Sequence, residues 1–283
     1  MAAYLRPTSI DAALQALAGR KLTVLAGGTD FYPARVGRPL DDDVLDITAI
    51  AGLRGISEAG DHWRIGATTT WSDVAASHTP LMFDGLKRAA REVGGAQIQN
   101  AGTVAGNLCN ASPAADGVPP LLSLDASVEL ASTGGVSVVP LADFILGNRR
   151  TRRASDALVT AIRVPKPRGH RAAGHFLKLG ARRYLVISIV MVAAVIECDQ
   201  AGRVTRAGVA VGACSEVARR LPDLEAALLG CPADVTLGER ADAQHLAGLV
   251  PIDDVRASAA YRSDAAVTVV RRALRELGAM VSA

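Results

Sequence analysis

The stretch GGAQIQNAGTVAGNLCNASPAADGVPP occupies residues 94–120 and is the least ordinary part of this 283-residue chain. It holds too many Gly, Asn, Ser and Pro residues to favour a regular helix or strand, and it carries little charge. Long irregular segments inside compact domains are usually functional. We therefore expect residues 94–120 to be an irregular segment that contributes to a binding site.

Two glycine-containing loops could hold a pyrophosphate. The first, AGGTD at residues 26–30, follows the apolar run LTVLA, and the second is GTVAGN at residues 102–107. Glycines let a backbone approach phosphate closely and adopt positive φ, while amide N–H groups and threonine hydroxyls donate to its oxygens. Either loop alone could equally be a tight turn without a ligand. The chain has neither a GxGxxG fingerprint nor a GK[ST] loop, which argues against a Rossmann dinucleotide site and an NTPase.

Polar residues follow the second loop closely. Asn107, Asn110, Ser112 and Asp116 lie within ten positions, so a folded segment could line one pocket with hydrogen-bond donors and acceptors. The alternative is a surface loop whose Asn and Ser side chains cap its own turns. The residues alone leave both interpretations open.

The rest of the chain predicts strands first and helices last. Residues 8–19 predict a helix with Thr8 or Ser9 as N-cap, and residues 22–26 and 44–47 predict strands. Hairpins are expected around residues 59–61, 133–135 and 199–202, and helices near residues 70–77, 81–93, 215–229, 238–248 and 264–280. The basic segment PKPRGHR at residues 165–171 is a candidate linker. We expect an α+β fold in which a C-terminal domain pairs an antiparallel sheet with helices.

Composition excludes several classes of protein. Hydrophobic residues make up 49% of the chain and charged residues 21%, which is typical of a folded protein of about two domains. A net charge of +3 gives no field that would favour nucleic acid. Residues 185–196 are apolar but too few to span a bilayer, and the N-terminus shows no export signal, so we expect a cytoplasmic protein. The four cysteines are too widely spaced for a metal or iron–sulfur motif, and we expect them to act as small buried apolar residues.

Three separated motifs together resemble one family. LAGGTD at residues 25–30, IQNAGTVAGN at 98–107 and NASPAAD at 110–116 resemble the FAD-binding subunit or domain of the xanthine dehydrogenase and carbon monoxide dehydrogenase family of molybdenum hydroxylases. The likeness extends from Tyr4 to about Gly230. It implies a two-subdomain FAD-binding domain of the PCMH type at residues 1–167, divided near residue 55 into 1–55 and 56–167. A C-terminal domain of the molybdenum-hydroxylase flavoprotein type is implied at residues 172–283.

The resemblance also implies site residues. Both glycine loops would hold the FAD pyrophosphate, Asn110 and Asp116 would lie along the flavin, and Val159 and Lys178 would contact its ring side. The implied cofactor-binding residues are Leu25, Ala26, Gly27, Gly28, Thr29, Asp30, Thr103, Val104, Ala105, Gly106, Asn107, Asn110, Asp116, Val159 and Lys178. Ala105 departs from the family pattern, where glycine is common, and its Cβ restricts φ. Without the resemblance, Val159 is a core strand residue and Lys178 a solvent-exposed lysine.

The implied function is electron transfer. FAD, held non-covalently, would receive electrons from a small [2Fe–2S] subunit, which takes them from a large molybdenum-cofactor subunit, in a dimer of heterotrimers. The final acceptor would be NAD⁺, oxygen or another oxidant. One alternative is a stand-alone FAD oxidoreductase, which would need a catalytic acid or base such as Glu197, His175 or His245. Another is a non-catalytic nucleotide-binding or scaffold protein. The arginines of residues 149–153 could meet an anion or an acidic partner, although a solvated connection is the simpler interpretation.

Overall fold

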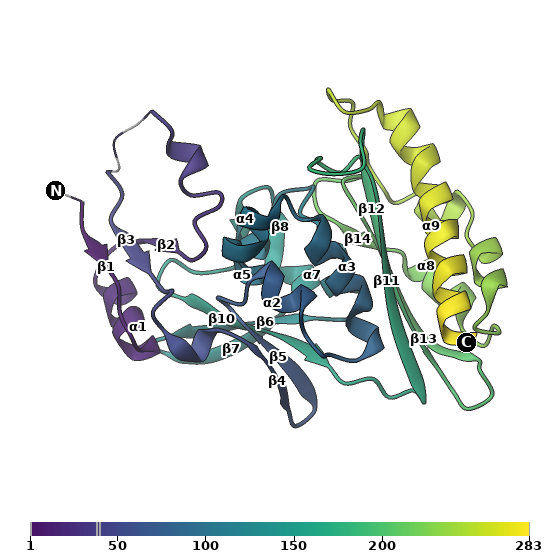
Figure 1. Ribbon diagram of the computed structural model, residues 1–283, viewed down its shortest axis with the longest axis horizontal. Helices are drawn as coiled ribbons and strands as arrows, with labels where there is room; N and C mark the ends of the chain where they lie inside the picture. Colours follow the sequence, from purple (N-terminus) through teal and green to yellow (C-terminus); the bar gives the residue numbers. More distant parts are fainter. Residues whose placement is uncertain (1, 38, 40, 283) are drawn as a thin grey trace.

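The computed structural model describes residues 2–37, 39 and 41–282. Near the N-terminus, a parallel sheet in the order β1-β3-β2 packs against helix α1 (Figure 1). Its elements are β1 (Tyr4–Leu5), α1 (Ile10–Gly19), β2 (Thr23–Leu25) and β3 (Val44–Asp46), with 3₁₀ turns η1 (Pro33–Arg35) and η2 (Ala51–Leu53). The N-cap of α1 is Ser9, whose hydroxyl accepts from the amide of Ala12. The predicted helix and both strands are confirmed.

An antiparallel sheet in the order β4-β5-β10-β6-β7 forms the middle of the molecule. Its strands are β4 (Ile56–Ala59), β5 (His62–Gly66), β10 (Leu158–Pro165), β6 (Ser127–Ser132) and β7 (Gly135–Pro140). The pairs β4–β5 and β6–β7 are the hairpins predicted from the turn residues at 59–61 and 133–135. A small hairpin joins β8 (Ile145–Gly147) to β9 (Arg150–Thr151).

Short helices pack between this middle sheet and a second antiparallel sheet, which residues 171–220 form. They are α2 (Trp71–Ala75), η3 (Leu81–Phe83), α3 (Asp84–Glu92), α4 (Ala96–Ala101), α5 (Val104–Asn110), α6 (Val118–Ser123) and α7 (Leu141–Phe144). The prediction that residues 94–120 are irregular was wrong, because α4 and α5 lie within them and α6 begins there. Thr103 caps α5 by accepting from the amide of Gly106, and prolines occupy the first turn of α6, where their missing N–H groups cost nothing.

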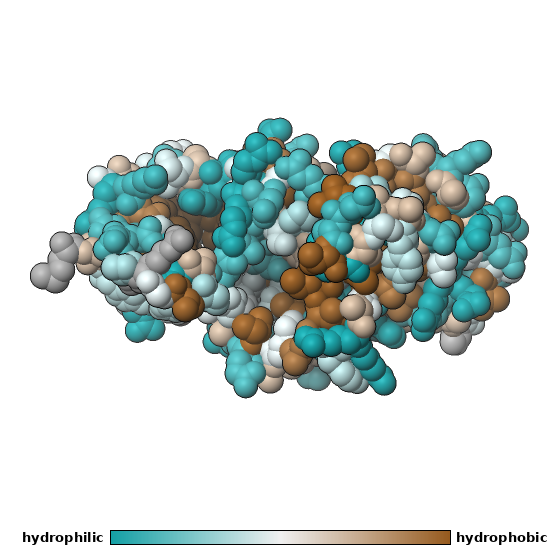
Figure 2. Space-filling model, turned by 90° about the horizontal axis from the view of Figure 1, so that it is seen from above, coloured by the Kyte–Doolittle hydropathy of each residue, from teal (hydrophilic) through white to brown (hydrophobic). Residues whose placement is uncertain are grey.

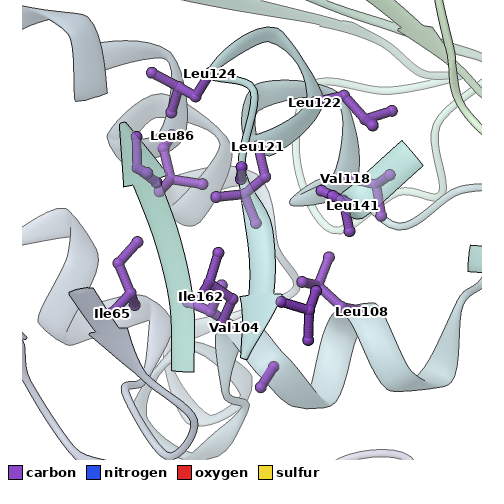
Figure 3. Packing of buried hydrophobic residues seen from close by; sticks show 14 of the residues in the cluster. Ile65, Leu86, Val104, Leu108, Val118, Leu121, Leu122, Leu124, Leu141 and Ile162 are labelled. Carbon is purple, nitrogen blue, oxygen red and sulfur yellow. The ribbon is translucent and has the colours of Figure 1, made fainter. Parts of the chain in front are cut away.

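A buried core joins these helices to both antiparallel sheets. Val104 and Leu108 of α5 lie beside Ile162 of β10, and Leu121 of α6 lies above them (Figure 3). The same cluster includes Val195 of β12 and further apolar residues of the C-terminal sheet. The apolar residues of the middle helices are therefore buried from two sides.

The C-terminal part pairs an antiparallel sheet, in the order β11-β12-β13-β14, with helix α9 across one face (Figure 1). Its elements are β11 (Arg171–Leu179), β12 (Val190–Cys198), β13 (Val204–Gly212), β14 (Arg219–Arg220), α8 (Pro222–Leu228), η4 (Val235–Arg240), η5 (Gln244–Leu246) and α9 (Ala259–Ser282). The long hairpin around residues 199–202 and the α+β class are confirmed. The helix predicted near residues 238–248 was wrong, because Asp234 and Asp242 accept from nearby amides and hold short 3₁₀ turns instead.

The surface combines polar ends with apolar residues near the middle. Figure 2 shows these apolar residues on the face seen from above. Tyr184, Leu185 and Ile187, which connect β11 to β12, are among the exposed large apolar side chains. No helix among the described residues is both long and apolar enough to span a bilayer.

Candidate cofactor site

The two glycine loops meet directly. A Cβ at Gly27 would overlap the carbonyl oxygen of Ala101, so the first loop packs against the end of α4 backbone to backbone. Gly28 has φ +71°, which favours glycine, and a Cβ there would lie 2.7 Å from the ring of Tyr32. Both glycines are thus required by the way the loops fold and pack, and the loops form the two sides of one cleft.

The cleft has a volume of about 540 Å³, within the ordinary range for ligand sites. In the view from above, the surface is hollowed between the N-terminal end and the middle of the molecule (Figure 2). Apolar side chains from β2, α4 and β10 form part of its wall, among them Leu25, Ile98, Leu158 and Val159. An apolar wall beside polar loops suits a ligand with an aromatic ring and a charged group.

Several residues that line this cleft carry polar groups without a hydrogen-bond partner. Among the residues that the structure describes, no carbonyl or side chain accepts from the amide N–H groups of residues 27–30, and the hydroxyl of Thr29 has no partner. The side-chain oxygen of Asn107 is buried without a hydrogen-bond partner, although Asn107 lines the cleft. Residues 27–30 are only partly buried, so their amides are open to a ligand that offers acceptors, such as a phosphate.

Positive charge surrounds the polar loops. Lys21, Arg35, Arg149 and Arg153 line the cleft together with the acid Asp30. Arg35 pairs with Asp42 at 2.6 Å and Arg149 pairs with Asp30 at 2.8 Å. The prediction of a solvated connection at residues 149–153 was therefore incomplete. An excess of cations and free amide donors fits an anion such as a pyrophosphate.

A buried ion pair lies behind the cleft wall. Lys178 of β11 donates to Asp116 at 2.7 Å and to the carbonyl of Glu92, whose neighbour Val93 lines the cleft. The hydroxyl of Ser188 donates to the other carboxyl oxygen of Asp116 at 2.6 Å. Burial raises the pKa of Asp116, although Lys178 and Ser188 oppose this. Lys178 is 6% exposed, so the solvent-exposed alternative was wrong.

Most of the predicted site residues come together. Those that line the cleft are Leu25, Ala26, Gly27, Gly28, Thr29, Asp30, Thr103, Ala105, Gly106, Asn107, Asn110 and Val159. Asp116 and Lys178 form the pair behind it, and the side chain of Val104 points into the core (Figure 3). Ala105 lies in the first turn of α5 and has no positive φ, so its Cβ carries no backbone strain.

Sequence reasoning missed several cleft residues. Trp71 contributes its side chain from α2, and Lys21 and Arg35 flank the first loop. No motif marks these residues, because they reach the cleft only through tertiary packing. Arg149 and Arg153 were noticed as a basic run, but nothing in the sequence indicated which arginines turn toward the cleft.

The residues that a stand-alone oxidoreductase would need lie elsewhere. Glu197 accepts from the amides of Arg168 and Gly169, His175 is buried against Glu276 at 2.8 Å, and His245 pairs with Asp242. None of the three lines the cleft. The structure therefore places none of these three candidates at the site.

The cysteines are free thiols, and Cys198 and Cys214 are buried as predicted. Cys109 and Cys231 are only partly buried, so the expectation holds for two of the four. Burial raises the pKa of Cys109 and of Cys214 to about 11, which keeps both thiols protonated at neutral pH. Within the described residues there is no group of three or more His, Cys, Asp or Glu side chains placed to hold a metal ion.

Comparison with known proteins identifies the family. A family model described as the FAD binding domain in molybdopterin dehydrogenase matches residues 1–167, which is more than half of the chain. The chain belongs to this family. In the C-terminal part of this FAD-binding family member, residues 175–277 match a second family model, described as the CO dehydrogenase flavoprotein C-terminal domain.

Several relatives of this FAD-binding family member are similar along nearly their whole length. The nicotine 6-hydroxylase medium subunit of Paenarthrobacter nicotinovorans is 29% identical, covering 98% of this chain and 97% of the relative. The xanthine dehydrogenase FAD-binding subunit of Escherichia coli O157:H7 is 30% identical, covering 97% and 95%. A solved carbon monoxide dehydrogenase chain from Hydrogenophaga pseudoflava superimposes with a TM-score of 0.84 at 28% identity, covering 98% and 96%.

Proposed function

We propose that this chain is the FAD-binding electron-transfer subunit of a heteromeric molybdenum hydroxylase. The observation that carries the proposal is the convergence of two distant glycine loops on one cleft with free amide donors, surplus positive charge and an apolar wall. The names of the relatives, which are FAD or medium subunits of such dehydrogenases and hydroxylases, support it.

The residues of the chain fit the parts of FAD. The amides of residues 27–30 and the Thr29 hydroxyl would bind the pyrophosphate, with Lys21 and Arg153 nearby to balance its charge. Val159 and its apolar neighbours would pack against the flavin ring and exclude water from it. The Asp116–Lys178 pair would hold the polar segment that runs along the flavin. When bound, FAD supplies the redox chemistry, and the protein supplies position and electrostatics.

The proposal assigns the remaining cofactors to partner chains. A small [2Fe–2S] subunit would deliver electrons and a large molybdenum subunit would oxidise the organic substrate, in a dimer of heterotrimers in the cytoplasm. NAD⁺, oxygen or another oxidant would accept the electrons. We also propose that residues 1–167 and 172–283 are the two domains.

Flavin analysis of the purified chain tests the proposal. We expect a yellow protein that releases about one FAD per chain on acid or heat treatment, with no flavin left on the precipitate, because attachment is non-covalent. Recovery of FMN, or a colourless protein that reconstitutes with neither flavin, would contradict it.

A further inference from the structure

The cleft is bounded by segments that touch at two places. At the first, Gly27 packs against the carbonyl of Ala101. At the second, Asp30 and Arg149 form a two-pronged ion pair with distances of 2.8 and 3.0 Å. Asp30 belongs to the first glycine loop, whereas Arg149 lies in the β8–β9 turn.

The β8–β9 turn is itself fixed to the second glycine segment. The amide of Arg149 donates to the carbonyl of Asn110, the last residue of α5, at 3.2 Å. The chain segments 27–30 and 101–110 are therefore joined both directly and through Arg149, and together they enclose one side of the cleft. Asp30, Asn110 and Arg149 all line it.

The two junctions differ in how easily they can open. At Gly27 two backbones are in contact, so separation would move both loops. Asp30 and Arg149 have side chains that are 46% and 59% exposed, and rotation about their side-chain bonds is enough to part them. Exposed ion pairs are weak and are screened by salt.

We propose that the Asp30–Arg149 pair is a latch over the cleft that controls the rate at which FAD enters and leaves. The proposal rests on the proposed function, since FAD is the ligand that the latch retains. A latch that closes the cleft equally with and without the ligand changes both rates by the same factor. It therefore alters exchange kinetics and leaves the dissociation constant of FAD unchanged.

Exchange kinetics of FAD in Asp30→Asn, Arg149→Gln and the double variant test the latch. Because an exposed ion pair contributes a factor of up to about five to an equilibrium, each single variant should speed both association and release by about threefold to fivefold. The double variant should be no faster than the singles, because one pair is lost in all three. Added salt should accelerate FAD release from the unsubstituted chain more than release from the variants, because only the unsubstituted chain has the pair to screen.

Arg152→Gln is the matched control. Arg152 lies in the same basic segment, is exposed and does not line the cleft, so its substitution should leave both rates unchanged. If Asp30→Asn slows release while Arg149→Gln speeds it, Arg149 binds the pyrophosphate directly and the latch is wrong. Unchanged rates in all variants would also overturn it. A chain that binds FAD in no variant would refute the proposed function itself, which is a distinct result.

Discussion

Gly27 and Gly28 have different physical roles although they are adjacent. Gly27 is needed because the carbonyl of Ala101 occupies the space that a Cβ would take, whereas Gly28 is needed because φ is +71°. The sequence indicated a tight loop but could not reveal that one of its glycines faces the second loop.

Gly28→Val should remove FAD from the purified chain. A β-branched side chain disfavours positive φ and would collide with Tyr32, which distorts the loop that carries the amide donors. We expect less than a tenth of the flavin content of the unsubstituted chain, measured by absorbance, with the C-terminal part still folded. Gly52→Ala is the control, because nothing lies within 4 Å of a Cβ there. Full flavin content in Gly28→Val would show that the first loop is only a turn.

Individual site residues were predictable where a motif marked them. The glycine loops, Asn107 and Val159 reach the cleft as the resemblance implied, although their contacts with FAD stay a prediction. The partners of Lys178 were not predictable, because Glu92 and Asp116 come from distant segments. Pairing over such sequence distances depends on the fold, and residue type alone does not specify it.

At the scale of elements, local turn chemistry predicted hairpins well and short helices poorly. The β4–β5 and β6–β7 turns were marked by Gly60, Asp61, Gly134 and Gly135, so their strands could be paired from the sequence. In contrast, α4 and α5 are too short to be stable alone, and α5 is held by the Thr103 cap and by core contacts of Val104 and Leu108. The division into domains at residues 167 and 172 stays a prediction.

Glu129 makes the middle sheet sensitive to acid. This buried β6 carboxylate accepts from Thr160 and Arg163 of β10 and pairs with Arg64 of β5. Burial acts to raise its pKa, but the hydrogen bonds outweigh it and the pKa is lowered. The unfolded chain then binds a proton at higher pH than the folded chain, so the stabilisation is complete above about pH 4.3 and is lost as pH falls through the folded pKa.

Glu129→Gln should flatten this pH dependence. We expect the variant to lose about 1–3 kcal/mol of unfolding free energy at pH 7, because Arg163 is left without its carboxylate. Its melting temperature should then fall less between pH 5 and pH 3 than that of the unsubstituted chain. Glu239→Gln, at an exposed position, should leave the pH profile unchanged. Parallel profiles for Glu129→Gln and the unsubstituted chain would contradict this account.

For the whole molecule, we expect electron transfer to require partner chains. Flavin reduction by an organic substrate should be at least tenfold slower in the isolated chain than in the complete complex, because Glu197, His175 and His245 all lie away from the cleft. Stopped-flow absorbance with and without a cluster-bearing small chain and a molybdenum chain measures this. Rapid reduction of the isolated chain would instead favour the stand-alone oxidoreductase.

Because α6 and the C-terminal sheet share one core, the C-terminal part cannot be removed or exchanged without exposing buried residues of α6. A Cβ at Gly208 of β13 would overlap the carbonyl of Ser123 in α6, and Val195 of β12 belongs to the same buried cluster as Leu121. A fragment that ends at residue 167 would leave this apolar surface of α6 facing water, where it favours aggregation. Chimeras that exchange the C-terminal part with a relative would therefore need α6 and β13 from the same parent.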